Sequence, residues 1–257
     1  MWNEVLFLPG NVPEFYISDT WLYGNARGGL VAGGPTTGIT AIGYGRNING
    51  DILINPTTGV PIADNVFKVF GDRNPNFTVG ITNNIRYKNW GLSFLWDYRN
   101  GGDIFNATEM FLYQRGRSML QNDRLTPRVV RGVLNDGLQN TANPTQNTIA
   151  VLPYYQQDYY TGVTPETFIE KDINWFRLRD LTLNYTFSSK VLGNAKWIKN
   201  LGAFVTVNDL ILFTNYRGAD PAVNGNTAST RGVGAAGFDF GNIAMPISWN
   251  FGIRAAF

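Results

Sequence analysis

Apolar and polar residues alternate most clearly between residues 76 and 99. Apolar side chains occupy odd positions from Phe77 to Tyr87 and even positions from Trp90 to Tyr98. This change of parity across Lys88-Asn89 predicts two antiparallel strands joined by a two-residue turn. The predicted pairs are Tyr87 with Trp90, Ile85 with Leu92, Ile81 with Trp96 and Val79 with Tyr98. All these side chains then share one face, and a slip of one residue would move every one of them to the other face.

Aromatic residues lie at both ends of this predicted hairpin. Tyr87 and Trp90 lie beside the turn, and Phe77, Trp96 and Tyr98 lie toward the other end. Aromatic rings favour the two membrane–water interfaces, and each arm has the length of about ten residues that a tilted strand needs to cross a bilayer. A hairpin of a soluble sandwich or lipocalin-like barrel would alternate equally well. The hairpin alone therefore leaves both interpretations open.

Three more strands are predicted in the second half of the chain, at 175–187, 201–210 and 247–257, with a bulge or a membrane boundary near Asp180. Residues 1–75 read as a loop-rich segment that precedes the barrel strands of 76–257. Its weak strand candidates are Glu4–Leu8, Glu14–Tyr23 and Ile39–Arg46.

Long irregular connections are predicted at 100–171 and 211–246, the first with one short helix around Ala107–Gln114. The other connections are shorter, at 88–89 and 188–199. Short turns that alternate with long loops are typical of transmembrane barrels, and favour one over a soluble barrel.

Composition narrows the function classes. The chain of 257 residues has no cysteine and no histidine, which excludes disulfides, thiolate nucleophiles, imidazole bases and the usual zinc sites. The net charge of +2 gives no reason to expect a nucleic-acid partner. No apolar run is long enough for a transmembrane helix. Without a nucleophile–base arrangement, we expect neither an enzyme nor a cofactor.

The segment Asn47–Asp51 resembles the start of a calcium-binding loop. Thr58 stands where such a loop needs a bidentate carboxylate, and the first position is Asn rather than Asp. We therefore expect a plain turn and no metal site.

The first residues have neither the basic segment nor the long apolar core of a secretory leader. A protein of the outer membrane must first cross the inner membrane. Either the chain is cytoplasmic, or its residues are the tail of a longer polypeptide.

Five short segments together resemble a known family. They are Gly71–Phe77, Arg99–Asn106, Asn174–Tyr185, Asn208–Leu210 leading into Phe213–Pro221, and the last strand ending in Phe257. In this order and spacing, they are similar to the SusC/RagA-type TonB-dependent transporters of the Bacteroidetes outer membrane.

The resemblance implies an all-β chain, with about six to eight antiparallel strands forming the C-terminal portion of a transmembrane barrel of about 22 strands. It implies an outer-membrane location in a Gram-negative bacterium, with the C-terminus in the periplasm. The implied partners are the bilayer, the remaining N-terminal barrel and plug, TonB and a SusD-like surface lipoprotein. The implied function is import of oligosaccharides or peptides. The alternative is a barrel that serves as a structural or assembly scaffold in a larger complex.

Candidate functional residues follow from this topology. Arg115, Arg128, Tyr154 and Tyr159 would lie on an extracellular loop, where they contact a ligand or lipoprotein unless they brace the loop itself. By resemblance, Trp249, Phe251 and Phe257 would form an outer-membrane assembly signal. The residues expected to face the barrel lumen are Arg86, Asp97, Asn184, Thr206, Asn250 and Arg254.

Overall fold

The structure is a computed structural model that describes residues 22–23, 26–28, 35, 37–188, 193, 197–223 and 236–257. The strand candidate Glu4–Leu8 lies outside these residues, as do most of Glu14–Tyr23 and parts of the connections 188–199 and 211–246. The chain divides into two compact units. Unit 1 comprises Met1–Asn74, Gly102–Lys171 and Ala222–Asn242, and unit 2 comprises Pro75–Gly101, Asp172–Pro221 and Ile243–Phe257.

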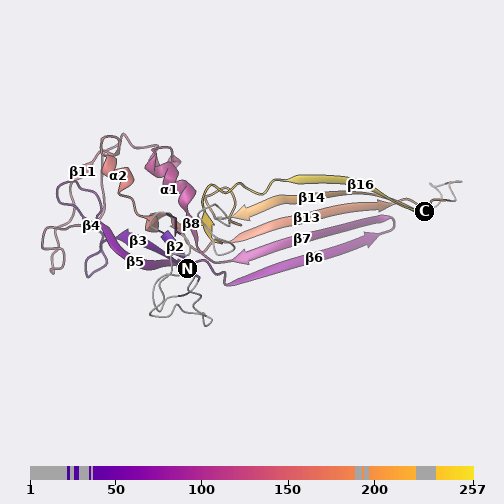
Figure 1. The fold of residues 1–257 in the computed structure, drawn as a ribbon, viewed down its shortest axis with the longest axis horizontal. Helices are drawn as coiled ribbons and strands as arrows, with labels where there is room; N and C mark the ends of the chain where they lie inside the picture. The colour runs from indigo at the N-terminus through magenta and orange to yellow at the C-terminus, as the bar shows by residue number, and fades with distance from the viewer. Residues whose placement is uncertain are drawn as a thin grey trace, which may run out of the picture. The chain divides into compact units, whose positions relative to one another are not determined.

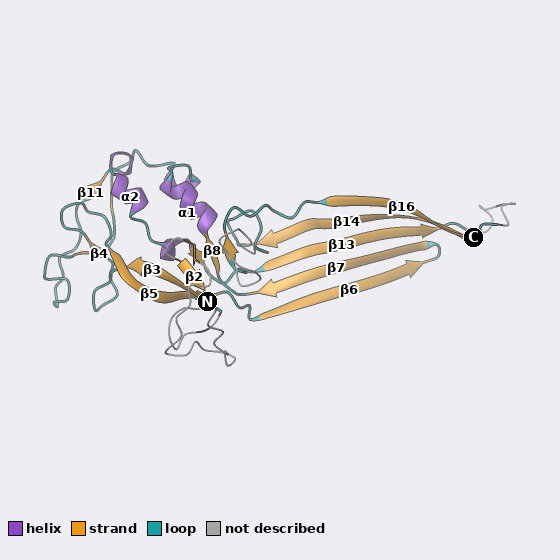
Figure 2. Cartoon of the chain, in the orientation of Figure 1, coloured by secondary structure: helices purple, strands orange, loops and turns teal. Residues whose placement is uncertain are grey.

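Unit 2 is built on a five-stranded antiparallel sheet in the order β16-β14-β13-β7-β6 (Figures 1 and 2). Its strands are β6 (Phe77–Tyr87), β7 (Trp90–Asn100), β13 (Trp175–Thr186), β14 (Asn200–Thr214) and β16 (Ser248–Ala256). The expected strands are thus confirmed, although β14 extends past residue 211, where a loop was predicted to begin.

The hairpin has the predicted register. Tyr87 pairs with Trp90, and each of the other three predicted pairs is also formed. Lys88 adopts a positive φ of 52°, as a tight hairpin turn requires. The bulge expected near Asp180 is confirmed too, because β13 shifts register between Leu178 and Asp180 against both of its neighbours.

The sheet is open in the described part of the chain. No described strand pairs with the outer edge of β6 or of β16, and the sheet contains five strands where about six to eight were expected. The reason for the smaller number is that the strand segments between residues 22 and 72 pair with one another instead of extending this sheet. An unpaired strand edge leaves backbone donors and acceptors unsatisfied.

Unit 1 contains smaller sheets and short helices. One sheet has the order β1-β2-β3-β5, and another has the order β12-β8-β15. The bounds are β1 (Leu22–Tyr23), β2 (Ala26–Gly28), β3 (Gly38–Tyr44), β5 (Ala63–Asp72), β8 (Ile104–Asn106), β12 (Ile169–Glu170) and β15 (Phe238–Asp239). Two-stranded pairs are formed by β4 (Leu53–Ile54) with β10 (Val133–Leu134), and by β9 (Arg128–Val129) with β11 (Ala150–Val151). The helices are α1 (Ala107–Gln114), α2 (Gln157–Thr161) and three 3₁₀ turns at Met119–Gln121, Pro153–Tyr155 and Pro165–Phe168.

The segment 100–171 differs from the irregular loop that the sequence predicted. Helix α1 lies where a helix was expected, but the segment also supplies strands and a hydrophobic core. Phe105, Phe168 and Phe238 are buried together with Ile39. These apolar residues follow no regular period in the sequence, so the core that they form could not be read from it.

Two expectations about local structure can be compared directly with the fold. The segment Asn47–Asp51 is a turn, in which Asn47 accepts from the backbone N–H of Gly50 and donates to the carbonyl of Asp51. This confirms the plain turn. Among the described residues, no helix combines the length and apolar character needed to cross a membrane.

Candidate functional site

The five-stranded sheet of unit 2 separates its side chains into an apolar face and a polar face. On the apolar face, cross-strand pairing aligns one row of Ile85, Leu92, Leu183, Val205 and Phe251. Many of these side chains are exposed, and Phe251 keeps 76% of its surface accessible. A contiguous exposed apolar face of this kind indicates contact with lipid or with another protein.

Aromatic residues mark both ends of the apolar face. Beside the Lys88-Asn89 turn, the Trp90 and Tyr185 rings lie 4.6 Å apart between centroids. At the other end, Trp96 stacks on Phe176 at 4.2 Å. The aromatic ends predicted for the hairpin therefore continue onto a third strand, as the two interfaces of a bilayer require of a spanning sheet.

The six residues expected to face a lumen share the opposite, polar face. Arg86 pairs with Gly91, Gly91 with Asn184 and Asn184 with Phe204, while Thr206 pairs with Asn250. Asp97 lies an even number of residues from Gly91 on β7, and Arg254 lies an even number of residues from Asn250 on β16. Both side chains therefore belong to the same face. We call the part of this face around the Leu178/Asp180 bulge the bulge end, and the part beside Lys88-Asn89 the turn end.

The bulge end contains a network of paired charges. Arg179 donates to Asp97 Oδ2 from Nε at 3.0 Å and from Nη2 at 2.8 Å. Arg177 donates from Nη1 to Asp209 Oδ1 at 3.2 Å and from Nη2 to Asp220. Only 1% of Arg177 is accessible, so its charge depends on these carboxylates. The bulge in β13 and the positive φ of Asp209 in β14 direct these side chains toward one another.

Asparagine side chains connect the strand ends next to this network. Asn174 accepts at Oδ1 from Asn100 Nδ2 at 2.8 Å and from the Gly101 N–H at 3.0 Å. Asn76 donates to Asn100 at 3.1 Å, and Asn215 accepts from the Asn174 N–H at 2.8 Å. Gly101 has a φ of 76°, and a Cβ there would meet Asn76, which explains why glycine is used at this position.

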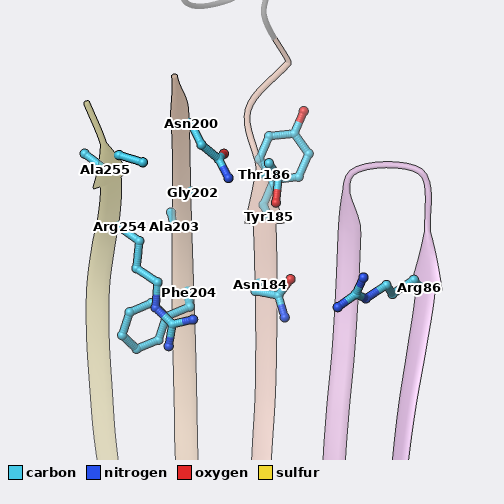
Figure 3. Close-up of a pocket in the computed structure, with 11 residues that line it drawn as sticks. Arg86, Asn184, Tyr185, Thr186, Asn200, Gly202, Ala203, Phe204, Arg254 and Ala255 are labelled. Atoms are coloured by element: carbon cyan, nitrogen blue, oxygen red, sulfur yellow. The ribbon is translucent and has the colours of Figure 1, made fainter. Parts of the chain in front are cut away.

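The turn end is a shallow hollow of about 330 Å³. Figure 3 shows Arg86 reaching across it from β6 and Arg254 from β16, with Asn184 and Phe204 on the strands between. The Arg254 guanidinium lies 4.7 Å from the centroid of the Phe204 ring. None of the described residues that line this hollow is an aspartate or a glutamate. The turn end thus presents basic and amide donors without a carboxylate.

Arg128 and Tyr159, two of the predicted loop residues, are brought together in unit 1. Arg128 donates from Nη1 to the Tyr159 hydroxyl at 3.3 Å and lies over its ring, 5.6 Å from the centroid. Its Nη2 also lies 2.7 Å from Asp123 Oδ1, and this hydrogen bond lowers the pKa of the Asp123 carboxyl. These contacts brace the segment, which is the alternative role considered for such residues.

Arg115 and Tyr154, the other two, do not join that pair. The backbone N–H of Tyr154 donates to the Arg124 carbonyl at 3.1 Å, and its exposed ring meets Tyr155 edge-on at 4.9 Å. Arg115 is exposed just after α1, beside a depression that Phe111 also lines. Both residues are exposed, unlike Arg128.

The residues predicted as an assembly signal are exposed. Trp249 and Phe251 lie on the apolar face of β16 with their rings 6.4 Å apart. The Phe257 ring stacks on Trp197 at 5.3 Å, and Lys199 Nζ donates to the Phe257 carbonyl at 2.9 Å.

Sequence reasoning missed the charge network of the bulge end, apart from Asp97. Arg177, Arg179, Asp209 and Asp220 all lie in the segments that carried the family resemblance. Their position in these segments was the available signal, because charged residues in segments that share a family resemblance can meet in the fold.

Comparison with known proteins finds TonB-dependent receptors among the relatives of this chain. No protein-family model matches the chain. It is 26% identical over 240 residues to TonB-dependent receptor P3 of Formosa agariphila, and 25% identical over 215 residues to TonB-dependent receptor P26 of the same organism. These matches cover 91% and 81% of the chain, but it spans only 22% and 19% of the two relatives.

The fold matches part of a solved transport complex. The structure of the RagAB peptide importer in the "open-open" state aligns with a TM-score of 0.54 at 14% identity, over 96% of this chain and 25% of that one. The "closed-closed" state aligns with a TM-score of 0.52 at 15% identity, over 95% and 25%. At this level of identity, the match shows a shared fold.

Proposed function

The chain is related to TonB-dependent receptors, and from that premise we propose that it forms part of the wall and outer surface of an outer-membrane importer. The observation that carries this proposal is the five-stranded sheet, because one face is apolar, exposed and aromatic at both ends, and the other is polar. A lipid-facing and a lumen-facing side are what a strand of a transport barrel needs. A receptor relationship also agrees with the expectation of a non-enzymatic protein.

In this proposal, the sheet belongs to a larger barrel whose remaining strands and plug lie elsewhere in the protein. The open edges of β6 and β16 support it, since unpaired backbone groups are not tolerated in hydrocarbon. TonB would supply the energy. The similarity to a chain of the RagAB complex supports a SusD-like lipoprotein as the surface partner, and peptides ahead of oligosaccharides as the cargo.

The proposed orientation has the C-terminus in the periplasm and the Lys88-Asn89 turn on the same side. Segment 100–171, nearly all of which is in unit 1, then belongs to the extracellular side. There, exposed Tyr154 and Arg115 would meet the cargo or the lipoprotein, while Arg128 and Tyr159 hold the segment in shape. Trp249, Phe251 and Phe257 remain the proposed assembly signal.

Transport is tested by deleting the gene in its native host and following the uptake of labelled oligopeptides and oligosaccharides. We expect peptide uptake to be lost, and to be lost equally when the proton gradient that drives TonB is collapsed. Normal uptake of both cargo classes, together with loss of a larger outer-membrane complex, would instead support the scaffold alternative.

Orientation is tested with single cysteines, because the chain has none of its own. On intact cells, an impermeant maleimide should label Asn122→Cys, which is exposed in unit 1, and spare Lys88→Cys at the turn. The reverse pattern would contradict the proposed topology and, with it, the extracellular role of segment 100–171.

A further inference from the structure

Charged residues are sorted along the strands of the five-stranded sheet. Three stretches that include its turn end, residues 78–96, 181–208 and 246–257, contain no aspartate or glutamate. Their polar face carries two arginines, Arg86 and Arg254. A surface with one sign of charge attracts ions of the opposite sign.

Neither guanidinium at the turn end has a carboxylate partner in the part of the chain that the structure describes. Arg86 is exposed and makes no hydrogen bond or ion pair with a described residue, and the contact of Arg254 is with the Phe204 ring. The connection 188–199 cannot supply a counter-ion either, because its sequence holds lysines and no acidic residue. Counter-charge must therefore come from another molecule or from outside these segments.

Strand pairing and two glycines place the side chains of the hollow. Asn184 lies two strands from Arg86, and the residue between them is Gly91, where a Cβ would collide with the Asn184 amide. On the other side, Gly252 leaves room for the Phe204 ring in the same way. The two glycines thus make room for the Asn184 amide and the Phe204 ring, and Figure 3 shows both side chains between Arg86 and Arg254.

We propose that this row, defined as Arg86, Asn184 and Arg254, binds the carboxylates of an acidic peptide cargo as it passes along the wall. Guanidinium groups bind carboxylates through charge-assisted and often bidentate hydrogen bonds, and an amide side chain matches a peptide group. A lipid headgroup is excluded because the row lies on the face opposite Trp249 and Phe251. The proposal rests on the proposed function and adds to it a preferred class of peptide.

Binding by the purified full-length receptor tests the row. The probes are the fluorescent peptide Ala-Glu-Ala-Glu-Ala and its glutamine twin, Ala-Gln-Ala-Gln-Ala. We expect the Arg86→Gln/Arg254→Gln double variant to weaken binding of the glutamate peptide by about tenfold or more, and to leave the glutamine peptide unchanged. Salt should weaken binding of the glutamate peptide to the wild type much more than to the double variant. The control is Arg131→Gln, which removes an exposed arginine of unit 1.

Each other outcome overturns the proposal. Equal weakening of both peptides would mean that the row supports the fold, and no change would mean that it binds neither peptide. Tighter binding in the double variant would show that carboxylates of the receptor itself occupy the row. Uptake by cells separates this test from the transport proposal. If the wild type imports neither peptide, the transport proposal is contradicted. The binding titration still decides whether the row selects carboxylates.

Discussion

The two ends of the polar face use arginine in opposite ways. At the bulge end, Arg177 is almost completely buried and held by Asp209 and Asp220. At the turn end, Arg86 is exposed and has no partner among the described residues. A buried charge is tolerated only with its partners, whereas an exposed one contributes little to stability and is available to a ligand. Arginines at comparable places on one sheet are therefore structural at one end and available for binding at the other.

The largest expected effect comes from breaking the buried pair. Asp220→Ala leaves Arg177 without one of its two carboxylates and should destabilise the protein by about 3–5 kcal/mol. The matched change at the turn end, Arg86→Ala, should cost less than about 0.5 kcal/mol. The measurement is the denaturant midpoint of the purified full-length receptor. Similar values for the two variants would remove the distinction between the ends.

A charge on the apolar face should have the next largest effect. A basic residue on the lipid face costs about 2–4 kcal/mol at the bilayer midplane, and an acidic one costs less. Trp249→Asp should therefore destabilise the sheet by up to about that amount and lower the amount of receptor in the outer membrane. Asn250→Asp is the control, because it adds the same charge one residue along β16 on the polar face. Equal outer-membrane levels for both variants would argue against lipid contact on the Trp249 side.

Crowding the Asn184 amide at the turn end should have a moderate effect. Gly91→Val places a side chain against the Asn184 amide and should cost about 1–3 kcal/mol through overpacking. Gly80→Val is the control on the same face, since a Cβ there meets only Leu95 at 4.0 Å. Thermal unfolding compares the two, and we expect the control to unfold like the wild type. An unaffected Gly91→Val variant would mean that glycine is not needed here to make room for Asn184.

The smallest effect should come from the Arg128–Asp123 pair. Like the buried Arg177–Asp220 pair, it joins an arginine to an aspartate, but it is more exposed. The hydrogen bond from Arg128 lowers the pKa of Asp123, so the pair stabilises the fold above the ordinary pKa of a carboxyl group. That contribution disappears as the pH falls through the lowered pKa. Arg128→Gln should therefore reduce the melting temperature slightly at neutral pH and not at all in strong acid. A pH-independent difference would assign the effect of Arg128 to its contact with Tyr159.

The alternation of apolar and polar residues was enough to predict the strands of the sheet and the face of each side chain. A period of two, with a change of parity at Lys88-Asn89, predicted the hairpin register residue by residue, and a second change of parity predicted the bulge near Asp180. These features depend on neighbouring residues along one or two strands. Because side chains alternate across a strand, assigning one residue to a face assigns the others.

Contacts between segments that lie far apart in the chain became known only from the folded structure. Segment 100–171 has no regular apolar period, so its core with Ile39 emerged only from packing. Likewise, Arg177 meets Asp220 through strand pairing and a loop, while Arg86 and Arg254, from the two edge strands, reach one hollow. The physical reason is that burial and counter-charge depend on neighbours in space. Residue type alone cannot say which arginine is paired and which remains available.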